Sequence, residues 1–396
     1  MEWIVKRSSE LYVSSSGLSK ASDQFGYGFP FLSYKDVFNN YYAPEELSTL
    51  VNSTEKDRQT CSVKRGDVFL TRTSETTDEL GMSCVALKDY DNATFNGFTK
   101  RLRPLTDEIV PEYAAYFFRS AYFRAQCQSL ASLITRASLN DGMICRFKIK
   151  FPKEKKQQER IGKILLTYDT LIENNTKRIR LLEKMAENLY KEWFVRFRFP
   201  GHEKVEIENG LPKGWKVESL GNLLDIRYGK DHKKLGDGDI PIYGSGGIMR
   251  YGNTALYDGS SVLIPRKGSL NNIIYVEGKF WTVDTMFYSV PKKDDICFYM
   301  FYVLSLVDMT AYNAGAALPS MTTSILNRMK VVLPDRDLLK KFDGILHAYH
   351  RQKQNLQHQN TLLAHQRDLL LPRLMSGKLE VKLPKHKPYL NKRLSY

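Results

Sequence analysis

Two segments of this chain, residues 168–193 and 349–374, carry the same helical sequence pattern 181 positions apart (349 − 168 = 181). In both, the key residues recur at alternating intervals of four and three, the spacing of the a and d positions of a coiled coil. The two sets are Ile161, Leu165, Tyr168, Ile172, Asn175, Ile179, Leu182, Ala186, Leu189 and Trp193, and then Phe342, Leu346, Tyr349, Lys353, Leu356, Asn360, Leu363, Arg367, Leu370 and Leu374. The sequence therefore predicts two long helices, each with one continuous seam.

The duplication extends into the segments that precede each helix. Residues 137–152 align without a gap on residues 319–334, a shift of 182 (319 − 137), and Trp3 aligns on Trp215, a shift of 212 (215 − 3). Because 212 − 182 = 30, the first globular part carries about thirty extra residues between these markers. A two-fold repeat of this kind usually meets a partner that is itself in two parts.

Composition narrows the kind of partner and the compartment. A formal charge of +15 on 396 residues favours a polyanion, although charge alone could equally serve solubility. The five cysteines (Cys61, Cys84, Cys127, Cys145 and Cys297) show no C-x-x-C spacing and are interpreted as buried thiols of a reducing cytoplasm. The N-terminal residues do not form a signal peptide, and the apolar run 296–307 suits a buried helix better than a membrane span.

The local pattern predicts mixed α and β structure in both globular parts. Strands are expected at 67–72, 147–151 and 262–265, and a helix at 111–119 whose counterpart begins near Asp295 and carries Tyr299 in place of Tyr116. The fold class is therefore α+β, with two mixed α/β globular domains in pseudo-two-fold arrangement, separated by two long helices packed as an antiparallel coiled coil. The expected boundaries are 1–152 for domain 1, 153–200 for the central helix, 201–334 for domain 2, 335–379 for the distal helix and 380–396 for a basic tail.

The two helices can be aligned by arithmetic. If they pack antiparallel with their centres matched, facing residues sum to 535, which places Asn175 opposite Asn360 and Trp193 opposite Phe342 (175 + 360 = 193 + 342 = 535). Two facing amides in an apolar seam would fix its register; the alternative is that both amides face solvent. A helix of about 33 residues is about 50 Å long, so the pair would act as a rigid spacer.

Three sequence phrases resemble a known family. Residues 189–201 (LYKEWFVRFRFPG), 211–215 (LPKGW) and 371–379 (LPRLMSGKL) are similar to the specificity (S) subunit of bacterial and archaeal type I restriction-modification systems, and the resemblance covers nearly the whole chain.

The resemblance implies that each globular part is a target recognition domain that recognises one half of a gapped sequence in double-stranded DNA, with the helices setting the gap. It also implies two methyltransferase (M) subunits and, for cleavage, two motor-nuclease (R) subunits as partners. No cofactor is then bound by this chain: S-adenosylmethionine is used by the M subunit, and ATP and Mg by the R subunit.

The motifs of catalysis are weak here. No Asn-Pro-Pro-aromatic motif, S-adenosylmethionine loop or phosphate loop is present in the sequence. Asp258 followed by Glu277 and Lys279 has the residue types of a metal-dependent nuclease, but the latter two sit where a hairpin turn is expected. His347 and His350 lack an evident third metal ligand. The expectation is a noncatalytic, cytoplasmic protein without a metal site; the alternatives are a free-standing DNA-binding protein and a nuclease.

Recognition of DNA needs donors and acceptors in loops, with cations near the phosphates. In the first half these features favour the loop after a predicted strand together with the residues just before the final strand. In the second half they favour a glycine-rich turn and the loop after residues 262–265. The candidate DNA-binding residues are Thr71, Arg72, Thr73, Ser74, Arg136, Ser138, Tyr243, Gly244, Ser245, Gly246, Arg266, Lys267, Ser269 and Ser320.

The long helices also carry apolar side chains outside the seam, among them Leu171, Leu181, Tyr190 and Phe194. A helix that is apolar beyond one stripe must be covered on more than one side. These four residues are therefore predicted to dock the M subunits, and polar substitutions there are expected to leave the fold intact.

Overall fold

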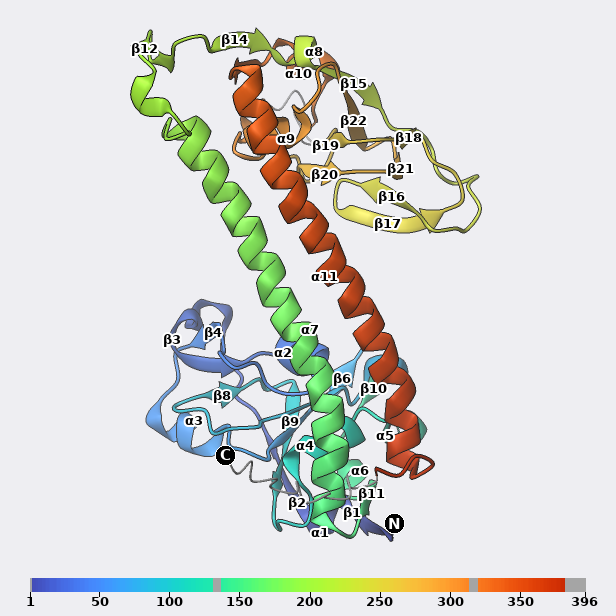
Figure 1. Ribbon diagram of the computed structural model, residues 1–396. Helices are drawn as coiled ribbons and strands as arrows, with labels where there is room; N and C mark the ends of the chain where they lie inside the picture. Colours follow the sequence, from blue (N-terminus) through green and yellow to red (C-terminus); the bar gives the residue numbers. More distant parts are fainter. Residues whose placement is uncertain (1, 131–136, 313–319, 382–396) are drawn as a thin grey trace, which may run out of the picture. The chain divides into compact units, whose positions relative to one another are not determined.

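The computed structural model describes residues 2–130, 137–312 and 320–381 (Figure 1). The chain divides into two compact units, which we call unit 1 (residues 1–174 and 359–396) and unit 2 (residues 175–358). Both divisions fall inside the long helices, so each unit contains one part of each helix. No helix among the described residues combines the length and the apolar character that a membrane span requires.

Unit 1 is built mainly from short strands that pair across long sequence separations. Its helices are α1 (Ser8–Leu11), α2 (Tyr34–Asn39), α3 (Glu55–Thr60), α4 (Pro111–Phe117), α5 (Ala121–Leu130) and α6 (Asp141–Ile144). Its strands are β1 (Trp3–Arg7), β2 (Tyr12–Ser16), β3 (Phe25–Leu32), β4 (Thr49–Val51), β5 (Val68–Thr71), β6 (Thr73–Ser74), β7 (Ser83–Val85), β8 (Thr94–Phe95), β9 (Thr99–Pro104), β10 (Ala137–Ser138) and β11 (Lys148–Pro152).

Unit 2 repeats this plan with fewer residues. Its helices are α8 (Leu220–Leu223), α9 (Cys297–Ser305) and α10 (Thr323–Arg328). Its strands are β12 (Ile207–Glu208), β13 (Leu211–Pro212), β14 (Lys216–Ser219), β15 (Leu224–Tyr228), β16 (Ile240–Gly244), β17 (Gly247–Gly252), β18 (Tyr257–Asp258), β19 (Ser261–Pro265), β20 (Ile274–Val276), β21 (Lys279–Thr282), β22 (Met286–Pro291) and β23 (Lys330–Leu333).

Sheet topology confirms the predicted duplication. The order β2-β9-β5-β7 in unit 1 corresponds to β15-β22-β19-β20 in unit 2, and β1-β11 corresponds to β14-β23. Even the register is kept, because Val5 pairs with Lys150 and Val217 with Val332, and these pairs are related by the shifts 212 and 182. Each unit therefore pairs the strand that begins its copy of the repeat, β1 or β14, with the strand that leads into a long helix.

The repeat also corrects one predicted equivalence. The Tyr113 hydroxyl donates to the Lys150 carbonyl at 2.9 Å, and the Tyr299 hydroxyl donates to the Val332 carbonyl at 2.6 Å. Tyr299 therefore corresponds to Tyr113 rather than to Tyr116, because it fastens its helix to the same point of the final strand.

The long helices are α7 (Lys155–Tyr190), continued by a π-helical turn over Lys191–Val195, and α11 (Arg336–Ser376). Gly377 follows α11 with φ +79°, the left-handed conformation expected of a glycine at a helix C-terminus. A Cβ there would lie 2.7 Å from Trp3 Nε1, so the position also needs a residue without a side chain. Both helices lie within the segments 153–200 and 335–379 that the sequence assigns to them, and each is a few residues shorter than its segment.

The predicted antiparallel register is found within each unit. In unit 2 the Trp193 and Phe342 ring centroids are 6.0 Å apart and Lys353 Nζ lies 2.6 Å from Glu183 Oε1. In unit 1 Arg367 forms an ion pair with Asp169. These pairs sum to 535, 536 and 536. The pairing of Asn175 with Asn360 would cross the division between the units and stays a prediction.

Two other expectations about side chains were wrong. Tyr190 and Phe194 are only 6% and 7% exposed and belong to the core of unit 2, where Phe194 packs against Trp215 and Tyr299 at 5.9 and 4.7 Å. The helical pattern assigns them to a docking face because it does not show that a globular core covers that face. Cys145 is exposed, whereas the other four thiols are buried as expected.

The segment around Glu277 is a turn but not a hairpin. β20 pairs with β19 and β21 pairs with β16 and β18, so the turn connects two different sheets. The predicted hairpin is wrong because the two strands, although adjacent in sequence, pair with strands of two different sheets.

Candidate functional site

In unit 1 the structure brings two predicted DNA-binding segments together. β10 pairs with β6 so that Ser138 faces Thr73, and the Leu139 amide donates to the Arg72 carbonyl at 2.8 Å. Arg72 and Thr73 are half-buried and Ser138 is exposed. The loop after β5 and the segment before the final strand therefore form one surface, although more than sixty residues separate them in sequence (138 − 73 = 65).

Unit 2 contains the same arrangement. Lys267 and Ser320 form a β-bridge, and the Met321 amide donates to the Arg266 carbonyl at 2.8 Å. Leu139 and Met321, like Ser138 and Ser320, are related by the shift of 182. We call the pair of segments at Arg72 and Ser138, and the corresponding pair at Arg266 and Ser320, the loop platforms. Each platform holds an arginine in the same backbone position.

Two predicted residues of the first platform are inside it rather than on its surface. Thr71 is fully buried, and its hydroxyl donates to the Glu79 carbonyl at 3.2 Å and accepts from the Met82 amide at 2.9 Å. Ser74 is 8% exposed and its hydroxyl donates to Glu79 Oε2 at 3.1 Å. Both side chains shape the loop and are withdrawn from the candidate contact residues. Arg136 lies outside the described residues.

The glycine-rich stretch of unit 2 forms the turn between β16 and β17, where Gly244 pairs with Gly247. The turn adjoins the second platform, because a Cβ on Gly268 would lie 2.9 Å from Ser245 Oγ and Asn272 Nδ2 donates to the Ser245 carbonyl at 2.8 Å. Gly246 is exposed, whereas Gly244 is buried and Tyr243 is half-buried. Ser245 is half-buried like Tyr243, so Gly246 is the exposed member of this stretch, and Ser269 is exposed nearby.

An ion pair between Lys100 and Asp141 lies beside the first platform. Lys100 is 6% exposed, and its ammonium donates to both carboxylate oxygens of Asp141 at 2.9 Å. The Ser14 hydroxyl donates to the same carboxylate at 2.6 Å. These hydrogen bonds, with smaller Coulombic contributions from Lys100 and Arg72, lower the pKa of Asp141 below its usual value of 3.8. The carboxylate is thus held ionised beside the arginine of the platform.

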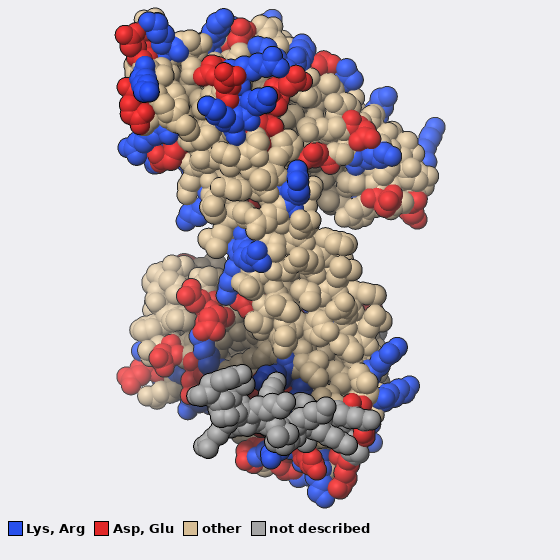
Figure 2. Space-filling view, viewed as in Figure 1, with Lys and Arg blue, Asp and Glu red and all other residues tan. Residues whose placement is uncertain are grey.

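Sequence reasoning missed two exposed aromatic residues at the platforms. Phe98 is 62% exposed and its carbonyl accepts from the Arg72 amide at 3.0 Å. Tyr228 is 51% exposed and the Arg266 guanidinium lies 5.4 Å from the centre of its ring. The available signals were an aromatic residue directly after the Asn96-Gly97 turn and one directly before Gly229. Figure 2 shows Lys and Arg interspersed with Asp and Glu on the face of unit 2 in view, so net charge alone does not locate a binding surface.

Comparisons with known proteins agree on one family. The family described as "Type I restriction modification DNA specificity domain" matches residues 2–184 and 212–363. The chain is 26% identical to the type I restriction enzyme MjaIX specificity subunit of Methanocaldococcus jannaschii over 413 aligned positions, which cover 96% of this chain and 94% of that one. It is 21% identical to the HindI specificity subunit of Haemophilus influenzae, covering 88% and 94% of the two chains.

The fold agrees as well. The crystal structure of an S subunit from M. genitalium superposes with a TM-score of 0.60 at 15% identity and covers 97% of both chains. Because the family match spans both halves of the repeat, it accounts for most of the sequence rather than for one segment. The chain belongs to the type I restriction-modification DNA specificity domain family.

Proposed function

We propose that this protein recognises a bipartite DNA sequence, with residues 1–152 and 201–334 as two target recognition domains that each contact one half. The observation that carries the proposal is the repetition of the loop platform, with Arg72 and Arg266 held by equivalent backbone hydrogen bonds of 2.8 Å. A guanidinium can contact guanine through two hydrogen bonds in the major groove, and hydroxyl groups can contact several bases. Ser138 and Ser320 supply such groups beside the two arginines.

We further propose that the long helices dock two M subunits through residues that lie outside their seam. Leu181 and Met185 of α7 are 59% and 50% exposed, and Leu362 of α11 is 47% exposed. Leu181 and Leu362 are related by the helical shift of 181, so each unit presents one apolar side chain in the same place. Exposed apolar groups in matching positions suit two copies of one partner. R subunits would join this assembly, bringing ATP and Mg, and the M subunits would bring S-adenosylmethionine.

The protein itself is proposed to be noncatalytic. The nuclease alternative needed Glu277 together with Asp258 and Lys279 around a metal ion. Glu277 instead faces α11, with its carboxylate 3.9 Å from His347 Nδ1 and 3.8 Å from His350 Nε2. Asp258 and Lys279 are paired across β18 and β21. The contacts of Glu277 favour a structural role at the junction of β20, β21 and the helix.

A domain exchange tests the proposal. Residues 209–334 would be replaced by the corresponding segment of another family member, and the chimera would be expressed with its M subunit. Sequencing of methylated DNA is expected to show one altered half-site and one unchanged half-site, because residues 1–152 are untouched. A change in both halves, or in neither, would contradict two independent recognition domains.

A further inference from the structure

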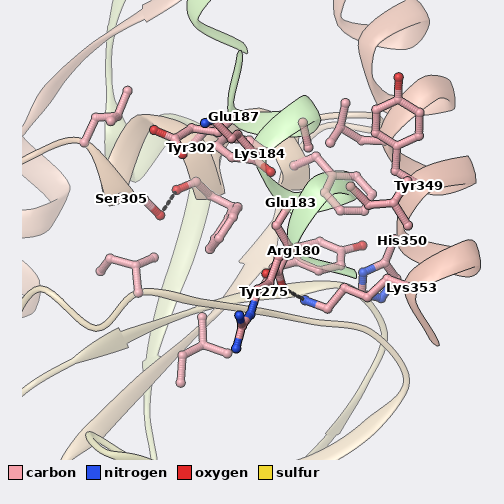
Figure 3. A pocket seen from close by; sticks show the side chains of 18 residues that line it. Arg180, Glu183, Lys184, Glu187, Tyr275, Tyr302, Ser305, Tyr349, His350 and Lys353 are labelled. Atoms are coloured by element: carbon pink, nitrogen blue, oxygen red, sulfur yellow. Dashed lines mark hydrogen bonds and ion pairs between the residues drawn. The ribbon is translucent and has the colours of Figure 1, made fainter. Parts of the chain in front are cut away.

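Unit 2 contains a large groove that the proposed DNA recognition does not use. Its volume is about 780 Å³, and it lies between the C-terminal part of α7, helix α9, the N-terminal part of α11 and strand β20. Figure 3 shows Tyr275, Tyr302 and Tyr349 entering it from three different elements. Ala186 and Leu346 form a buried apolar floor, each less than 5% exposed.

The internal repeat identifies the counterpart of this groove in unit 1. The equivalence of Tyr113 with Tyr299 aligns α4 on α9 with a shift of 186 (299 − 113), so Tyr116 corresponds to Tyr302 and Arg119 to Ser305. The helical shift of 181 aligns Asp169 on His350, and Arg367 occupies the place taken by Ala186 (367 − 186 = 181). The unit 2 members of four of these pairs, Tyr302, Ser305, His350 and Ala186, line the groove.

In unit 1 the corresponding place is filled by aromatic side chains of the same chain. The Tyr41 ring lies 5.1 Å from the Tyr116 ring, and the Arg367 guanidinium lies 4.8 Å from the Tyr41 ring. Tyr42, next in sequence, lies close enough to Asp169 and Glu173 of α7 for their charges to raise the pKa of its phenol, after the larger effect of burial. Tyr41 and Tyr42 together cover this face of the helices.

Arg119 holds that aromatic segment in position. Its guanidinium donates to the carbonyls of Val37, Phe38 and Asn40 at 2.9, 2.7 and 2.9 Å. The segment belongs to the connection between β3 and β4, which carries α2 and both tyrosines. In unit 2 the corresponding strands, β16 and β17, are joined by Ser245 and Gly246 alone. The extra residues of the first half thus supply the aromatic side chains that fill this space in unit 1. Unit 2 has no such residues in the corresponding connection, and its small Ser305 and Ala186 side chains leave the groove open.

The groove rim carries positive charge. Glu183 is paired with Lys353 at 2.6 Å and Glu187 with Lys191 at 2.5 Å. Within the described part of the chain, Arg180 and Lys184 have no carboxylate partner, and both are exposed. Arg180 and Lys184 adjoin Leu181 and Met185 along α7, so the rim continues into the proposed docking face of that helix.

We propose that this groove receives an aromatic side chain, flanked by an acidic residue, from the M subunit. The inference rests on the proposed docking of M subunits and names where one contact is made. Tyr41 shows that a tyrosine fits between equivalent helices in unit 1, and a buried aromatic residue typically dominates the energetics of an interface. The cationic rim favours a neighbouring carboxylate. The partner would then complete in unit 2 what residues of the chain itself complete in unit 1.

The test fills the groove from its edge. Ser305 is exposed on α9, so Ser305→Trp would place an indole in the groove, and Ser324→Trp, at an exposed serine on α10, is the matched control. Binding of the purified M subunit to the full-length chain would be measured by biolayer interferometry. Ser305→Trp is expected to weaken binding by about tenfold or more, and Ser324→Trp is expected to leave it unchanged.

A second variant keeps the test decisive if the indole disturbs folding. Lys184→Glu changes only an exposed charge and is expected to weaken M binding and to reduce its dependence on salt. A photocrosslinking residue at Leu306, which is 48% exposed at the rim, is expected to label an M-subunit peptide that contains an aromatic and an acidic residue. Unchanged binding by both variants, with no labelled M peptide, would overturn the groove proposal alone. If the unsubstituted chain did not bind M at all, the proposed docking function would fail first.

Discussion

The Tyr116 hydroxyl donates a 2.5 Å hydrogen bond to Asp169 Oδ2, which fastens helix α4 to the long helix α7. Burial and the adjacent Asp169 carboxylate raise the pKa of Tyr116 well above its ordinary value, so the phenol remains a donor. Arg367 of α11 donates to the other oxygen of the same carboxylate. One buried carboxylate therefore joins three elements of unit 1.

We expect Asp169→Asn to destabilise unit 1 strongly. Asp169 is 9% exposed and the Arg367 side chain 14%, so the substitution removes the buried carboxylate partner of Arg367 and leaves its guanidinium only the more exposed Asp368. Removal of one partner of a buried ion pair costs about 3 kcal/mol or more in free energy of unfolding. Urea denaturation would measure it. Glu2→Gln, which breaks the exposed Glu2–Lys153 pair, is the control and should cost about 0.5 kcal/mol or less. Equal effects of the two substitutions would contradict the assigned role of Asp169.

A second prediction concerns pH. The Ser14 hydroxyl and the Lys100 ammonium lower the pKa of Asp141 below 3.8 in the folded protein. A lowered carboxyl pKa contributes stability that is present above pH 3.8 and is lost as pH falls through the folded pKa. Asp141→Asn should therefore be less stable than the unsubstituted chain at neutral pH, and the difference should shrink as the pH falls below 3.8 and disappear below the folded pKa of Asp141.

The midpoint of urea unfolding, measured for Asp141→Asn and for the unsubstituted chain as the pH is lowered, would show this convergence. Asp91→Asn, at an exposed carboxylate, provides the control and should run parallel to the unsubstituted chain at every pH. A difference between Asp141→Asn and the unsubstituted chain that stays constant as the pH falls below 3.8 would show that the Asp141 carboxylate is not the titrating group.

The seam was predictable because a heptad pattern determines which residues face each other once two helices are antiparallel. Trp193 and Phe342 meet as the arithmetic predicts, at 6.0 Å. The fate of Tyr190 and Phe194 was not predictable in the same way. Either a partner or the globular part of the same chain can cover an apolar side chain outside the seam, and the helical period is identical in both cases.

The candidate site was predictable only in outline. The segments around Arg72 and Ser138 could be selected by residue type, but their hydrogen-bonded contact depends on strand pairing across the chain. Residue type also selects Thr71, but its position at a strand end does not reveal that its hydroxyl is hydrogen-bonded to both the Glu79 carbonyl and the Met82 amide. The groove of unit 2 could not be predicted as the counterpart of the Tyr41 site from the sequence. That equivalence depends on matching Tyr113 with Tyr299, and the match appears only in their hydrogen bonds.

A third prediction separates the two platforms. Arg72→Ala should relax recognition in one half of the DNA target, and Arg266→Ala in the other, because the two arginines occupy equivalent positions in different units. Loss of one bidentate contact should reduce discrimination at a single base pair by about tenfold. Methylation of a library of DNA targets would measure it, with Lys216→Ala, at an exposed cation of β14, as the control. If either substitution relaxed both halves, the platforms would not be independent.

A fourth prediction concerns docking. Leu181→Asp and Leu362→Asp are each expected to lose one M subunit from the complex, because both side chains are exposed and are related by the repeat. Phe194→Asp should instead unfold unit 2, since Phe194 packs 4.9 Å from Phe342 in its core. Native mass spectrometry would give the stoichiometry, and circular dichroism would confirm folding. A folded Leu181→Asp variant that retained two M subunits would rule out this face of α7.

The last prediction is that the length of the long helices sets the gap between the two half-sites. α7 is one uninterrupted helix from Lys155 to Tyr190, and it contributes residues to both units. One added heptad in both helices would lengthen the pair by about 10 Å at 1.5 Å per residue. That length corresponds to about three base pairs at 3.4 Å each, or fewer if the helices are inclined to the DNA axis.

A four-residue insertion near Lys177, in α7 alone, should therefore lengthen the gap by about one or two base pairs. It should also lower stability, because Asn175, which is 7% exposed, would lose its proposed partner Asn360 in the shifted register. The bases recognised in each half should not change, since neither globular part is altered. Long-read sequencing of methylated DNA would measure both the gap and the bases. An active variant with an unchanged gap would show that the spacing is set by something other than these helices.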